Sequence, residues 1–135
     1  MAVTTRKVRN TDALGHKILV VPLITAISQA DVLAYKFIPG HAFEIVGVEG
    51  WARTEAGVVT ADVKIEAVTS LAAVIAFATA TRVVATLAAT LAARRGSASN
   101  AINVHFTTDG TGALTNGFVT VRYRPMPMSG DAGHE

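Results

Sequence analysis

The sequence predicts an all-β domain, built as a single antiparallel β-sandwich of jelly-roll type with an extended N-terminal arm. Apolar residues alternate with polar ones at a period of two, which is typical of strands with one buried and one solvated face. Turn-forming residues recur at intervals of about 8–15 residues, and no series of long amphipathic helices separates the strands. Half of the 135 residues are hydrophobic and 16% are charged, which is typical of a folded chain with a real core.

The clearest alternation lies near the C-terminus, in residues 102–106 and 119–124. Residues 107–117 between them are rich in Gly, Thr, Asn and Asp, a composition that favours a turn. We therefore predict an antiparallel hairpin, whose second strand ends at Pro125 because proline has no N–H for the ladder. The residues predicted to face the core of the sandwich are Val63, Ile65, Ile102, Val104, Phe106, Val119 and Val121.

Further strands are expected at residues 32–38, 43–51 and 58–65. The strand at 43–51 has apolar residues on both of its faces, and Gly47 and Gly50 within it indicate a bulge or a close backbone approach. Together with the turn signals between them, these strands extend the sandwich from residue 31 to residue 125.

Residues 66–95 are ambiguous between strand and helix. Alanine and leucine dominate and favour helix, whereas many β-branched residues oppose one long helix. We predict short strands at 71–75 and 82–87, followed by a helical turn at 88–95 with Gly96 as its C-terminal cap. Arg82 interrupts the apolar stretch before it reaches the roughly 20 residues that a transmembrane helix needs.

The first thirty residues are predicted to form an arm that contacts another subunit. Basic residues open the chain, and the apolar segment that follows at 18–27 contains Pro22, which argues against a central strand. Such a segment can be buried on assembly, with the charges pairing at its rim. The alternative is an ordinary edge strand of the same domain. The predicted parts are an arm at 1–30, a sandwich domain at 31–125 and a tail at 126–135.

No pattern in the sequence indicates catalysis or a bound cofactor. The four histidines lack the spacing of a helical zinc pair, and Asp109 lacks the further carboxylates of a calcium loop. The serines lack a nucleophile-elbow context, and the chain has no cysteine. A net charge of +2 is too small to indicate nucleic-acid binding. We expect no enzymatic activity, metal, cofactor, nucleic-acid partner or membrane segment.

Several motifs follow one another in the C-terminal half. They are Arg94-Arg95-Gly96 before a polar loop, the strand at 102–106, the Thr-Asp-Gly-Thr-Gly turn at 108–112, and a closing strand that ends in Arg124-Pro125. Together with the Phe37-Ile38-Pro39 turn and the strand at 62–65, they resemble small virion proteins of tailed bacteriophages, namely capsid decoration, cement or head-fibre proteins. The resemblance implies a β-sandwich that binds the outer face of a capsid, often as a trimer, without enzymatic activity.

The resulting functional prediction is a structural virion protein that binds and stabilises the outer surface of a phage capsid. It would be made in the host cytoplasm and would contact the major capsid protein and other copies of itself, as a homotrimer or other homo-oligomer. The alternatives are a tail structural protein and a carbohydrate- or receptor-binding module with Trp51, Tyr35 and Tyr123 as its platform. For Arg94 and Arg95, pairing with acids is favoured over phosphate binding. The candidate partner-binding residues are Arg6, Lys7, Arg9, Ile18, Val20, Leu23, Trp51, Arg94 and Arg95.

Overall fold

Two antiparallel five-stranded sheets form most of the protein. The computed structural model describes residues 15–23, 32–108 and 113–126. Sheet A contains β1 (Lys17–Leu23), β12 (Gly117–Pro125), β3 (Phe43–Trp51), β8 (Val83–Val84) and β9 (Arg95–Gly96). Sheet B contains β2 (Val32–Phe37), β10 (Ile102–Thr108), β5 (Val59–Ile65), β6 (Val68–Thr69) and β7 (Ile75–Ala76). The prediction of an all-β fold is confirmed.

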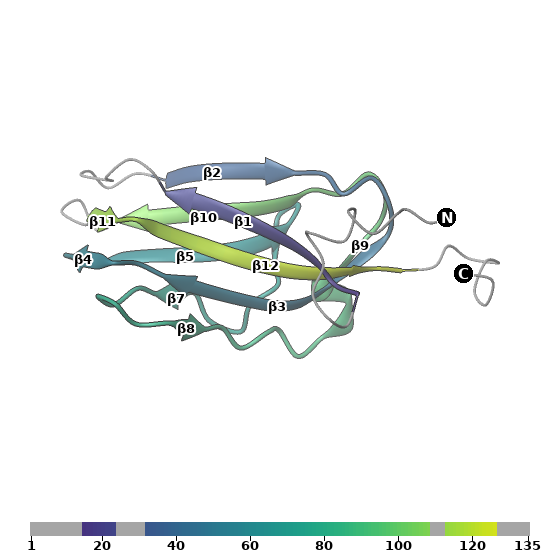
Figure 1. Ribbon diagram of the computed structural model, residues 1–135. Helices are drawn as coiled ribbons and strands as arrows, with labels where there is room; N and C mark the ends of the chain where they lie inside the picture. The colour runs from purple at the N-terminus through teal and green to yellow at the C-terminus, as the bar shows by residue number, and fades with distance from the viewer. Residues whose placement is uncertain (1–14, 24–31, 109–112, 127–135) are drawn as a thin grey trace.

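The strand order places sequence-distant strands side by side. Sheet A runs β1-β12-β3-β8, with β9 also on β3, and sheet B runs β2-β10-β5-β6, with β7 also on β5. A small third pair joins β4 (Thr54–Ala56) to β11 (Ala113–Thr115). The chain therefore passes from one sheet to the other after β1, β2, β3, β7, β9 and β10. Figure 1 shows the two sheets stacked as two layers.

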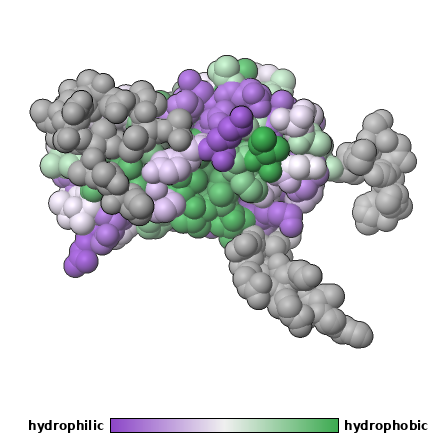
Figure 2. All heavy atoms as spheres, turned by 90° about the horizontal axis from the view of Figure 1, so that it is seen from above, coloured by the Kyte–Doolittle hydropathy of each residue, from purple (hydrophilic) through white to green (hydrophobic). Residues whose placement is uncertain are grey.

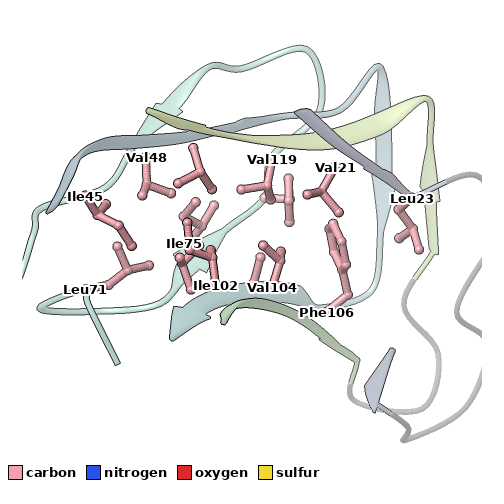
Figure 3. Packing of buried hydrophobic residues seen from close by; sticks show 14 of the residues in the cluster. Val21, Leu23, Ile45, Val48, Leu71, Ile75, Ile102, Val104, Phe106 and Val119 are labelled. Carbon is pink, nitrogen blue, oxygen red and sulfur yellow. The ribbon is translucent and has the colours of Figure 1, made fainter. Parts of the chain in front are cut away.

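The core lies between the two layers. In Figure 3, Val48, Val119 and Val21 extend from sheet A toward Ile102, Val104 and Phe106 of sheet B. Phe106 packs edge-on against Tyr35 and stacks on Phe77, with ring centroids 6.1 and 6.0 Å away. All seven residues predicted to face the core are buried, with at most 5% of their surface exposed: Val63, Ile65, Ile102, Val104, Phe106, Val119 and Val121.

The predicted C-terminal hairpin is wrong. β10 lies in sheet B between β2 and β5, whereas β12 lies in sheet A between β1 and β3. β11 forms part of the connection between them and pairs with β4. Alternation shows which face of a strand is buried, but it contains no information on which sheet the strand joins.

The predicted arm at residues 1–30 is wrong for Lys17–Leu23. These residues form β1, which pairs antiparallel with β12 along its whole length, and Val21 and Leu23 are part of the core. Within the described part of the chain, β12 is the one strand that pairs with β1. Pro22 is therefore tolerated, because proline without an N–H is accommodated on an edge strand.

The alanine-rich region from 66 to 95 consists of short strands and loops. β7 and β8 cover small parts of the two strands predicted there, and Leu71 and Leu87 form an isolated bridge. The predicted helical turn is the 3-10 helix η2 (Leu91–Arg94). No helix in the described residues is long and apolar enough to cross a membrane.

Gly96 does not cap that turn. It lies in β9 opposite Phe43, and a Cβ placed on it would lie 2.7 Å from Cε1 of the buried Phe43 ring. Glycine is therefore required here for close packing, not for a left-handed backbone conformation.

Candidate partner-binding face

A β-bulge in β3 places two carboxylates on the outer face of sheet A. Glu44 and Glu49 are five residues apart, so they would lie on opposite faces of a regular strand. The register between β3 and β12 shifts so that Arg122 pairs with Gly47 and Tyr123 with Ile45. The extra residue in β3 exchanges the faces on which the residues after it lie. Both glutamates therefore lie on the same face of sheet A as Arg122 and Arg124.

Three arginines converge on Glu44, whose side chain is only 8% exposed. Oε1 accepts hydrogen bonds from Nη2 of Arg124 at 2.9 Å and from Nε of Arg95 at 3.2 Å, and Nη1 of Arg94 lies 3.5 Å from Oε2. The hydrogen bond from Arg124, opposed by burial and assisted by the charges of Arg124 and Arg95, holds the pKa of Glu44 below its ordinary value of 4.5. Glu44 is therefore ionised at neutral pH and anchors the segment around β9 to β3.

Two further arginines approach Glu49 on the same face. Nε and Nη2 of Arg82 both donate to Oε1, at 2.8 and 2.6 Å, and Nη1 of Arg122 lies 4.0 Å from the same oxygen. The Arg82 side chain is 64% exposed, so this pair contributes little to stability.

Five guanidinium groups therefore accompany two carboxylates on this face, and these seven side chains carry three positive charges in excess. We call this set of arginines the arginine band; it consists of Arg82, Arg94, Arg95, Arg122 and Arg124. Arginine keeps its charge at any physiological pH and offers several donors to a carboxylate. The band is suited to binding an anionic surface.

An apolar patch adjoins the arginine band at the other end of β12. Pro22, Phe118 and Trp51 are neighbours across β1, β12 and β3, and the rings of Trp51 and Phe118 lie 5.9 Å apart. Val20 stands beside them and is 55% exposed. We call these four residues the apolar corner. They line a cavity of about 490 Å³, with Leu23 and Leu114 also in its wall.

A second, smaller apolar groove lies between the edges of the two sheets. β1 contributes Leu19 to it and β2 contributes Tyr35 and Phe37, and the cavity measures about 220 Å³. Figure 2 shows hydrophobic atoms gathered in the middle of the molecule when it is seen from above Figure 1, the side on which β2 lies. This groove contains no cluster of charges, so it gives less indication of the chemistry of a partner.

The outer face of sheet B differs in character from that of sheet A. Its strands present small polar and mixed charged residues, including Thr60, Asp62 and Lys64 on β5 opposite Asn103 and His105 on β10. Asp62 accepts a hydrogen bond from Thr69 at 2.6 Å. This composition is typical of a solvated face, and it makes sheet B a natural control in binding experiments.

The predicted partner-binding residues are distributed over several environments. Arg6, Lys7 and Arg9 lie outside the described residues. Ile18 is half-buried and Val20 exposed on β1. Trp51 belongs to the apolar corner, and Arg94 and Arg95 pair with Glu44, which is the acid pairing favoured from the sequence.

Leu23 is a correction to that set. Only 1% of its surface is exposed, and it packs in the core of its own chain. The reason is its position in β1: Leu23 has the same parity as Val21, which also points between the sheets.

The proposed aromatic platform of Trp51, Tyr35 and Tyr123 is not assembled. Tyr123 is buried and packs against Phe43 and Phe37, and burial raises the pKa of its hydroxyl above 10.0. Tyr35 extends from β2 in the other sheet and contacts Phe106. Trp51 is thus the single member of the three that lies on the outer face of sheet A.

Several residues of this face were not predicted from the sequence. Arg122 and Arg124 alternate with apolar residues in β12, a signal that would have placed both on one outer face. Glu44 and Glu49 had no such signal, because the bulge position could not be fixed from the two nearby glycines. The unpredicted residues are Pro22, Glu44, Glu49, Arg82, Phe118, Arg122 and Arg124.

The described residues contain no group of three or more His, Asp or Glu side chains placed to hold a metal ion. No protein-family model matches the sequence, and no curated protein or solved structure matches the chain.

Proposed function

We propose that the protein is a non-enzymatic structural protein of a virion, which binds and stabilises the outer surface of a phage capsid as a decoration or cement protein. The motif resemblance in residues 31–125 suggests this class. When β1, β2, β3, β5, β6, β8, β10 and β12 are numbered one to eight, the sheets run 1-8-3-6 and 2-7-4-5. We interpret this order as a jelly roll, an architecture found in viral capsid domains and also in lectins.

One observation carries the proposal: the outer face of sheet A combines the arginine band with the apolar corner. Arginine and tryptophan are enriched at protein–protein interfaces, where an apolar centre is surrounded by a polar rim. An exposed apolar patch beside paired charges favours binding of a protein surface. The polar outer face of sheet B remains available to solvent in this arrangement.

Cosedimentation with capsid particles that lack the protein tests the proposal. We expect the purified chain to bind such particles saturably and to raise the temperature at which they rupture. Deleting residues 1–14, which removes Arg6, Lys7 and Arg9 but keeps β1, tests the contribution of the basic arm. Binding to no particle, or binding without any change in particle stability, would contradict a cement function.

A carbohydrate-binding module is the second candidate, because Trp51 stands beside an open cavity of about 490 Å³. Sugars stack on exposed aromatic faces, and lectin domains share the jelly-roll architecture. A glycan array read with wild-type protein and with Trp51→Ala separates the two candidates. Specific glycan binding that depends on Trp51, without particle binding, would favour the second.

A further inference from the structure

We propose that the outer face of sheet A binds an extended acidic segment of a partner protein, with one apolar side chain in the cavity of the apolar corner and carboxylates on the arginine band. The inference rests on the proposed function, since it names the chemistry of the partner at that same face. Its two components are a positive charge excess and an apolar cavity on neighbouring parts of one sheet surface.

Charge complementarity identifies the partner as acidic. Glu44 orients three arginines, Arg94, Arg95 and Arg124, but neutralises only one of their charges. Each guanidinium has five N–H donors, so groups that already contact a glutamate keep further donors for another carboxylate. Because the ion pairs orient these side chains before binding, less conformational entropy is lost when a partner binds.

The geometry of β12 sets the spacing that the partner needs. Phe118 lies at the cavity, Arg122 is four residues further along the strand and Arg124 is six residues further. At about 3.3 Å per residue, these steps correspond to roughly 13 and 20 Å. An extended segment on this face therefore requires an apolar residue with acidic residues about four and six positions away in one direction.

A protein segment fits this face better than a nucleic acid. Nucleic-acid sites use basic patches to neutralise a continuous series of phosphates, whereas Glu44 and Glu49 here interrupt the arginine band with negative charge. The cavity at the apolar corner also has an apolar wall, made by Val20, Pro22 and Leu23. Such a wall favours an aliphatic or aromatic side chain over a polar nucleotide.

The fluorescence of Trp51 reports directly on binding at the cavity, because Trp51 is the one tryptophan of the chain and lines the cavity. The probe is a synthetic peptide with a leucine followed by glutamates four and six positions further along, and serine and threonine elsewhere. One control peptide has lysines in place of the glutamates, and another has the glutamates adjacent to the leucine. We expect a saturable change in Trp51 fluorescence with the first peptide, and binding that weakens as salt rises.

Matched protein variants localise the binding. Arg122→Gln is expected to weaken binding of the acidic peptide at least about threefold, as loss of one charge contact predicts. Arg82→Glu is a second variant for the same measurement, at a side chain that is mostly exposed. Lys64→Glu places the same charge reversal on the outer face of sheet B, where Lys64 lies opposite Asn103, and should leave the affinity unchanged.

Three results would overturn the inference: equal binding of the lysine peptide, no saturable signal with any peptide at millimolar concentration, or tighter binding of a single-stranded oligonucleotide. The particle assay separates this inference from the proposed function. If wild-type protein binds particles and Arg122→Gln and Arg82→Glu bind equally well, the inference fails alone. If the acidic peptide binds as described but no particle does, the proposed function fails and the acidic-segment site remains.

Discussion

Replacing Glu44 with glutamine is expected to lower the free energy of unfolding by about 1–3 kcal/mol. The substitution keeps the shape of the side chain and removes its charge. Two hydrogen bonds at 2.9 and 3.2 Å and a third contact at 3.5 Å then lose their ionic partner. Because the Glu44 side chain is almost fully buried, solvent replaces these interactions poorly.

Urea unfolding followed by circular dichroism measures this difference, and Glu49→Gln is the matched control. Glu49 also pairs with two arginines, but Arg82 is mostly exposed, so we expect a loss below about 1 kcal/mol. Equal losses for the two variants would refute the reasoning that burial makes the Glu44 cluster the stronger one. So would a Glu44→Gln variant as stable as the wild type.

The pH dependence of the free energy of unfolding, compared between wild type and Glu44→Gln, gives an independent check. The pKa of Glu44 is lowered in the folded state, so the carboxylate contributes stability that is fully present above its unfolded-state pKa, about 4.5. That contribution is lost as pH falls through the lower folded-state pKa. The difference between wild type and Glu44→Gln should therefore be constant from pH 6 to pH 8, and should shrink as the pH is lowered below about 4.5.

Further predictions concern packing. In the same urea titration, Gly96→Ala should lower the free energy of unfolding by about 1–3 kcal/mol, because its added Cβ overpacks against the buried Phe43 ring. Gly47→Ala is the control. Its added Cβ meets nothing closer than 3.9 Å, so it should be neutral or slightly stabilising. Phe106→Ala should cost about 3–5 kcal/mol, and a loss below about 1 kcal/mol would contradict its burial. Deleting the chain through the end of β1 should lower the melting temperature more than a deletion that stops at residue 14, and equal melting temperatures would contradict the pairing of β1 with β12.

The sequence allowed the buried faces of the long strands to be predicted, because the period of two is a local property of the chain. In β5, for example, Val59, Ala61, Val63 and Ile65 are all buried, while the residues between them are half-buried. Strand partners could not be predicted in the same way. β10 and β12 are neighbours in sequence with a turn-rich segment between them, yet each pairs with strands from the first half of the chain.

β1 was misassigned because two of the three features used for the arm prediction, the apolar run and Pro22, each have more than one structural cause. An apolar run can be buried in its own domain or at an interface, and Pro22 excludes a central strand but not an edge strand. The short strands β6, β7 and β8 have two residues each, which is too few for any periodicity to be visible. β6 forms a tight hairpin with β5, whereas the position of β8 depends on contacts with β3, which is distant in sequence. β7 pairs with the start of β5.

The bulge in β3 connects the fold to the candidate site. If β3 were regular from Phe43 to Trp51, a register that buried Phe43 and Ile45 would also point Glu49 and Trp51 to faces opposite to those observed. The single extra residue lets Phe43, Ile45 and Val48 all enter the core while Glu44, Glu49 and Trp51 share the outer face of sheet A. The apolar pattern on both faces of this strand, visible in the sequence, is therefore accounted for by one local irregularity, and that irregularity brings the apolar corner and the arginine band onto the same surface.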